Sequence, residues 1–154
     1  MRTILLTAAV ALTACNPCSS RITLVSDGPE DFSAKYSCEA LEHIENSMTS
    51  ALFWIPASRL DGYTVHVYPE SMEQDPWGRY SDGFAICANK ALYVRDMADR
   101  GPEKTALPHE LGHAMENCDP GAAPCDKGRD ADHCHWTSSG IGPAIGITMG
   151  ETGL

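Results

Sequence analysis

The stretch LPHELGHAMENCD, from Leu107 to Asp119, decides how the rest of the chain is interpreted. On an α-helix His109 and His113 lie one turn apart, so both side chains project from one face and can converge on a single cation. Glu110 lies beside His109, where its carboxylate can reach a water on that cation without binding the cation itself. The spacing therefore predicts a metal site on a helix, with His109 and His113 as ligands and Glu110 as general base.

A helix over this stretch has start and stop signals. Thr105 is a candidate N-cap, because its hydroxyl can accept a backbone N–H of the first turn. Pro108 then falls in that first turn, where its missing N–H costs little. Pro120 and Gly121 cannot extend the helix, so we expect it to end near residue 117.

A second helical pattern precedes the motif. Between Ser33 and Trp54 an apolar residue recurs every three or four positions, which predicts a helix with one buried face. The positions on that face are Cys38, Leu41, Ile44, Met48, Leu52 and Ile55. Pro56 follows and ends the pattern.

Short strands lie between the two helical patterns. The segment GYTVHVYP, residues 62–69, alternates between apolar and polar side chains as a strand does. Two more strands are expected around residues 83–88 and 91–95, with Asn89 and Lys90 as the hairpin turn. The order of helix, strands and helix predicts an α+β fold.

The N-terminus is typical of an exported chain. MRTILLTAAVALTAC combines one arginine, an apolar run too short to span a bilayer, and Cys15. The residues LTAC that end at Cys15 resemble the bacterial lipobox; an ordinary signal peptide cut nearby is the alternative. The lipobox implies a signal peptide over residues 1–14, a lipidated tether over residues 15–32, and one catalytic domain over residues 33–154. We therefore expect a protein of the bacterial cell envelope, anchored to the membrane by lipid at Cys15.

Composition agrees with export. The formal net charge of −10 makes nucleic acid an unsuitable partner. Apart from Cys15, the cysteines form an even set, which in an oxidising compartment predicts disulfides of undetermined pairing. The members are Cys18, Cys38, Cys87, Cys118, Cys125 and Cys134. A zinc knuckle on the last three is the alternative, although their spacing lacks the paired C-x-x-C pattern.

A third metal ligand is needed, because two histidines alone hold zinc weakly. We favour His133, since Asp130 and Asp132 beside it can act as acceptors that orient its ring. The alternatives are His135, Asp119 and Glu116. We expect His43 at the surface and His66 as a strand residue with its own polar partner, so neither is predicted as a ligand.

LPHELGHAM resembles the zinc helix of the zincin metallopeptidases. The resemblance implies zinc as cofactor, His109 and His113 as ligands, and Glu110 as general base. It also implies a small mixed sheet with a backing helix and an active-site helix, in which an edge strand binds an extended peptide. The C-terminal half, after the zinc helix, would be cross-linked by disulfides. The chain departs from the metzincin pattern HExxHxxGxxH/D at Glu116, which stands where that pattern has its glycine, whereas Asp119 occupies the final ligand position.

Two functions compete at this stage. The first is a zinc-dependent peptidase that hydrolyses peptide or protein substrates in the cell envelope, with an oxyanion stabiliser among Tyr80, Tyr93 and His135. The second is a non-catalytic envelope lipoprotein that uses a zincin scaffold as an adaptor or inhibitor. The presence of Glu110 favours the peptidase, because a binding scaffold has no need of a general base. The sequence does not indicate the oligomeric state.

Overall fold

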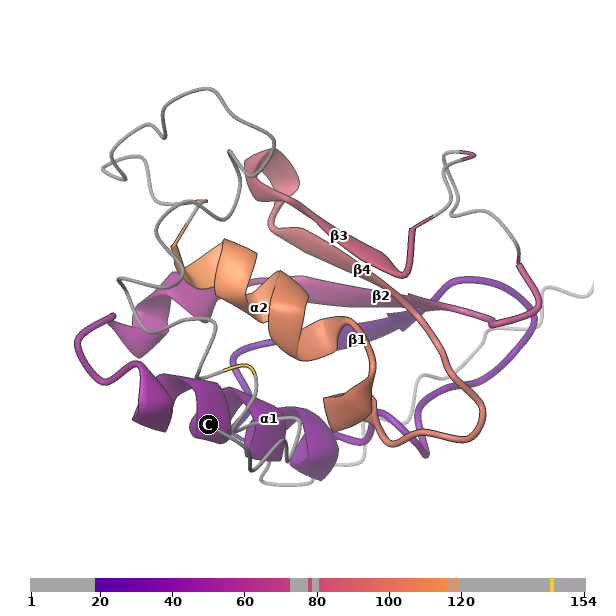
Figure 1. Ribbon diagram of the computed structural model, residues 1–154, viewed down its shortest axis with the longest axis horizontal. Helices are drawn as coiled ribbons and strands as arrows, with labels where there is room; N and C mark the ends of the chain where they lie inside the picture. The colour runs from indigo at the N-terminus through magenta and orange to yellow at the C-terminus, as the bar shows by residue number, and fades with distance from the viewer. Residues whose placement is uncertain (1–18, 73–77, 79–80, 117, 119–144, 146–154) are drawn as a thin grey trace, which may run out of the picture.

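The computed structural model describes residues 19–72, 78, 81–116, 118 and 145. Within these residues the secondary structure comprises two α-helices, four strands and three short 3₁₀ helices (Figure 1). The strands are β1 (Thr23–Ser26), β2 (Thr64–Tyr68), β3 (Gly83–Ile86) and β4 (Ala91–Arg95). The helices are α1 (Cys38–Ala51) and α2 (Leu107–Met115), and the 3₁₀ helices are η1 (Ala57–Leu60), η2 (Cys87–Asn89) and η3 (Pro102–Lys104).

The strands form one mixed sheet in the order β1-β2-β4-β3. β1, β2 and β4 run parallel, whereas β3 pairs antiparallel with β4 at the edge. The hairpin between β3 and β4 turns at Lys90, which takes a left-handed conformation with φ of 52°. The predicted α+β fold with a small mixed sheet and two helices is confirmed.

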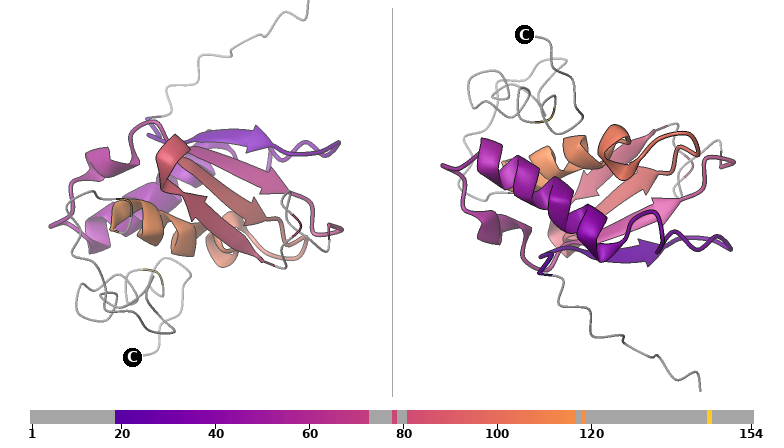
Figure 2. Two further views of the ribbon diagram at one scale, coloured as in Figure 1. Left: turned by 90° about the horizontal axis from the view of Figure 1, so that it is seen from above. Right: turned by 90° about the horizontal axis from the view of Figure 1, so that it is seen from below.

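Both α-helices pack on the same face of the sheet (Figure 2). α2 lies against β3 and β4 and also contacts α1. On this face β2 contributes Val65 and Val67, which are fully buried together with Met48 of α1 and Leu111 of α2. Burial of each such side chain contributes about 1.5–3 kcal/mol, so this apolar layer fixes the position of α2 on the sheet. The buried face predicted for the first helix is confirmed at Leu41, Ile44, Met48, Leu52 and Ile55.

One strand lies where the sequence predicted a tether. β1 falls inside residues 15–32, and it pairs in parallel with β2 through the register Thr23↔Thr64 to Ser26↔Val67. Ile22 and Phe32 on either side of β1 are buried in the main core. The folded part of the chain therefore begins before residue 33, because parallel pairing with β2 orders a segment too short to show a strand pattern by itself.

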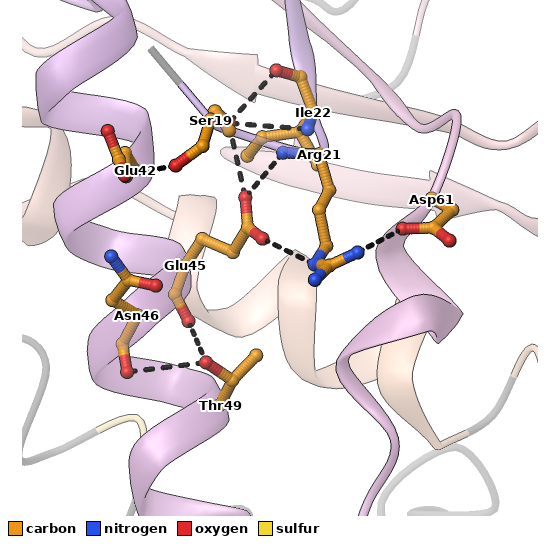
Figure 3. Close-up of polar contacts among 9 residues, drawn as sticks. Ser19, Arg21, Ile22, Glu42, Glu45, Asn46, Thr49 and Asp61 are labelled. Atoms are coloured by element: carbon orange, nitrogen blue, oxygen red, sulfur yellow. Dashed lines mark hydrogen bonds and ion pairs between the residues drawn. The ribbon is translucent and has the colours of Figure 1, made fainter. Parts of the chain in front are cut away.

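A polar network holds the start of β1 against α1 (Figure 3). The buried carboxylate of Glu45 accepts the backbone N–H of Arg21 at 2.8 Å and lies 3.2 Å from its Nε. The same guanidinium reaches Asp61 at 2.7 Å, and Ser19 donates to Glu42 at 2.5 Å. The carboxylate of Glu45 is buried, and a buried charge without partners is costly to remove from water. The two contacts from Arg21 compensate this charge.

Disulfide formation, which the sequence predicted, is observed. Cys87 in η2 is bonded to Cys118 beyond the end of α2. Cys38 is also disulfide-bonded, and its partner lies outside the described residues. Cys15, at the predicted lipidation site, lies outside them as well. None of the helices in the described part of the chain is long and apolar enough to cross a membrane.

Candidate functional site

The motif LPHELGHAM coincides with α2. Pro108 lies in the first turn, as predicted, but the N-cap is Ala106 rather than Thr105. The Thr105 hydroxyl still accepts the N–H of Leu107 at 3.3 Å while it donates to the carbonyl of Pro102 at 2.7 Å. Thr105 therefore supports the first turn of α2, but it does so as the residue before the N-cap and not as the N-cap itself.

His109 and His113 lie on one face of α2, with ring centroids 5.0 Å apart. Both side chains are partly exposed. Zinc binds a histidine nitrogen at about 2.0–2.1 Å, so rings at this separation can share one ion. The donor set thus fits zinc as far as it is described. No third His, Cys, Asp or Glu joins the pair to form a metal-binding group within the described residues.

Glu110 is buried, with 3% of its surface exposed. Its Oε2 has no hydrogen-bond partner among the described residues. Burial disfavours the charged carboxylate and raises its pKa from 4.5 to about 8. A buried carboxylate oxygen without a hydrogen-bond partner among the described residues is costly to the fold, and such groups cluster at functional sites.

Gly83, the first residue of edge strand β3, lies directly against Glu110. A Cβ atom at this position would stand 2.9 Å from Glu110 Oε1 and 2.7 Å from the Cβ of Ala106. Both distances are shorter than ordinary carbon contacts, so only glycine permits α2 to approach the strand this closely. The absent side chain leaves the carboxylate beside the backbone of the edge strand.

Gly83→Ala is expected to destabilise the protein by about 1–3 kcal/mol through overpacking and to displace Glu110. The measurement is urea unfolding of the metal-free protein. Adding Ala106→Gly removes the tightest contact and should restore part of the lost stability, although the contact with Glu110 remains. If Gly83→Ala unfolds at the wild-type urea concentration, α2 does not lie this close to β3.

A cavity of about 390 Å³ opens beside these residues. Among the residues that line it are Gly83, Arg100, Lys104, Thr105, His109 and Glu110. His113 is not part of the lining, so the cavity lies on the His109 side of the histidine pair. An edge strand, a buried carboxyl group and one of the two histidines therefore border the same space.

The other predicted residues fall in three groups. The favoured third ligand His133 and the alternatives His135 and Asp119 lie outside the described residues, as does Tyr80. Glu116 follows the last residue of α2 and forms no metal-binding group with the two histidines. Tyr93 stacks on Phe84 and on His66, with ring centroids 4.6 Å from each, and does not line the cavity.

The two histidines set aside as ligands behave as expected. His43 is exposed on α1. The Nδ1 atom of His66 lies 3.1 Å from the carboxylate of Asp27, so the strand histidine has its own polar partner. Sequence reasoning missed Gly83, Arg100 and Lys104. A glycine at the start of an edge strand was the one available signal, since it often marks a close approach of another backbone or ligand.

Comparison of the chain with models of known protein families, with curated proteins and with solved structures finds no match.

Proposed function

We propose that this chain is a zinc-dependent peptidase with a zincin-like site, exported to the bacterial cell envelope and anchored there by lipid at Cys15. The observation that carries the proposal is the arrangement on α2. His109 and His113 share one face, while the buried Glu110 borders the same cavity as His109 and the edge strand. This placement is what metal-assisted amide hydrolysis requires of a general base.

The residues proposed to hold zinc are His109, His113 and His133. Zinc, when bound, supplies Lewis acidity to the attacking water and to the peptide carbonyl. Glu110 accepts the proton of the water and then donates it to the leaving amine. Burial raises the pKa of Glu110 to about 8 in the metal-free protein, and a zinc ion beside the carboxylate would lower it, which favours the base form near neutral pH.

Edge strand β3 is proposed to align the substrate. The outer edge of a sheet presents backbone N–H and C=O groups to which an extended peptide can add as a further strand. Gly83 at the start of β3 borders the cavity and lies close to Glu110. A peptide added along β3 would thus pass the general base.

Zinc content is the test. We expect about one zinc per chain in protein isolated from the envelope of expressing bacteria, because structural and catalytic zinc sites bind tightly. His113→Ala and His133→Ala should each lose the metal. His43→Ala is the matched control, since His43 is exposed on α1, away from the motif. His135→Ala shows whether the neighbouring histidine is the third ligand instead.

Folded wild-type protein without zinc would contradict the peptidase, and the adaptor would then be the better account. Zinc retained by His113→Ala would equally exclude α2 as the metal-binding helix. Loss of zinc in His135→Ala rather than in His133→Ala would keep the proposal and correct its third ligand.

A further inference from the structure

Positive charge gathers at the cavity beside Glu110. Arg95, Arg100 and Lys104 all line it, together with the acidic residues Asp82 and Glu110. The whole chain carries a formal net charge of −10, so a cationic wall at this position does not follow from composition. The lining holds three cationic side chains against two acidic ones, a balance that favours an anionic group in the cavity.

The acidic residues nearby compensate this charge only in part, since among the described residues Glu110 forms no ion pair with any of the three cations. Asp82 forms an ion pair with Arg95 at 3.6 Å, which offsets one cation. Asp99, on the same loop, is exposed and lies 4.0 Å from Arg100, a distance and exposure at which ion pairs contribute little. Neither Asp99 nor Glu103 is among the residues that line the cavity. Among the described residues, Arg100 and Lys104 therefore have no buried carboxylate partner and can interact with a ligand in the cavity.

The loop that presents Arg100 and Lys104 is anchored at both ends. At its start, the buried Asp96 accepts the hydroxyl of Tyr36 at 3.0 Å and pairs with Lys35 at 2.7 Å. At its end, Pro102 and Thr105 are both buried, and the Thr105 hydroxyl closes the turn between them by donating to the carbonyl of Pro102 at 2.7 Å. These contacts hold the loop before any ligand arrives, so binding costs less conformational entropy.

We propose that Arg100 and Lys104 form a subsite for a carboxylate of the peptide substrate, close to the bond that is cleaved. Lysine and arginine form charge-assisted hydrogen bonds with carboxylates. His109 and Glu110 line the same cavity, so a bound carboxylate lies near the reacting atoms. This inference rests on the proposed peptidase function and adds the substrate class, which is peptides with an acidic side chain or a free C-terminus.

Binding and cleavage are measured with the same peptides, which are short, fluorescein-labelled and alanine-rich. They differ in one glutamate against glutamine, and each is made with a free and with an amidated C-terminus. Binding is followed by fluorescence anisotropy on the full chain carrying Glu110→Gln, and cleavage is followed on the wild type. The free and amidated forms distinguish a C-terminal carboxylate from a side-chain carboxylate as the bound group.

The glutamate peptide, or the free-acid form, is expected to bind about tenfold more tightly than its neutral counterpart. Arg100→Gln combined with Lys104→Gln should remove this preference and leave zinc content unchanged. Lys90→Gln removes a positive charge on the hairpin turn, outside the cavity lining, and should keep the preference.

The outcomes separate the two proposals. Cleavage by the wild type without any preference for a carboxylate overturns the subsite and leaves the peptidase in place. A carboxylate preference that depends on Arg100 and Lys104, in a wild type that cleaves none of the peptides, supports the subsite and contradicts the peptidase. Absence of binding by all the peptides overturns the subsite.

Discussion

Glu110→Gln is expected to reduce peptide hydrolysis by about 10²–10⁴-fold while the protein keeps its zinc, because the variant loses proton transfer but not the histidine ligands. Glutamine is nearly isosteric with glutamate and fits the same buried position against Gly83. The measurement is kcat/KM on a denatured protein substrate, with zinc content determined on the same samples.

The control for this variant comes from the end of the same helix. Glu116 follows α2, and its Oε2 is also buried without a hydrogen-bond partner among the described residues. Glu116 does not line the cavity, so Glu116→Gln should retain activity. Equal losses in the two variants, with zinc retained in both, would mean that removal of a carboxylate at or near α2, and not proton transfer by Glu110, lowers the rate.

Glu110→Gln should also change how the free energy of unfolding depends on pH. In the metal-free wild type the pKa of Glu110 rises on folding from 4.5 to about 8 because the carboxyl group is buried. The folded state thus binds a proton more tightly than the unfolded state, and stability falls as the pH rises through this window. Glu110→Gln cannot ionise, so it should be more stable than the wild type above pH 8, by at most about 4–5 kcal/mol.

The two proteins should differ least below the unfolded pKa of 4.5, where the wild-type carboxyl is protonated in both states. Denaturant unfolding of chelator-treated protein across this pH range measures the difference. A gap that does not change with pH would show that Glu110 ionises as easily in the fold as in the unfolded chain. A gain in stability together with a loss of activity is the pattern expected of a functional residue held at a cost to the fold.

The sequence predicted those elements whose signal is local. The apolar period of α1 and the alternation in β2 arise from burial of one face of each element, and both are confirmed. β1 was missed because it has only four residues, which are partly or fully exposed. Its strand conformation depends on pairing with β2, far along the chain, and no local pattern records that contact.

The residues of the candidate site also fall into a part that local sequence predicts and a part that depends on tertiary contacts. His109, Glu110 and His113 share a helix, so their relative placement follows from helical geometry and could be predicted. Gly83, Arg100 and Lys104 reach the site only because α2 packs against β3 and the loop after β4 passes the start of α2. Those contacts are tertiary, and no local pattern in the sequence records them.

Removal of the disulfide in Cys87→Ala/Cys118→Ala is expected to lower the free energy of unfolding by about 3–4 kcal/mol. The bond closes a loop with a sequence separation of 31, and the main effect of such a cross-link is to restrict the unfolded chain. Urea unfolding under non-reducing conditions measures the loss, and unchanged stability would contradict it. Chelator-treated samples exclude a contribution from zinc binding.

The position of this bond predicts a local effect as well. Cys87 immediately follows β3 and Cys118 follows the last turn of α2, so the disulfide ties the edge strand to the proposed zinc helix. If this disulfide also stabilises the native state, its removal should accelerate amide exchange in β3 more than in β1 and β2. Uniform acceleration would mean that the bond acts on the unfolded chain alone. Because β3 is proposed to align the substrate beside Glu110, selective loosening of β3 should raise KM with little change in zinc content.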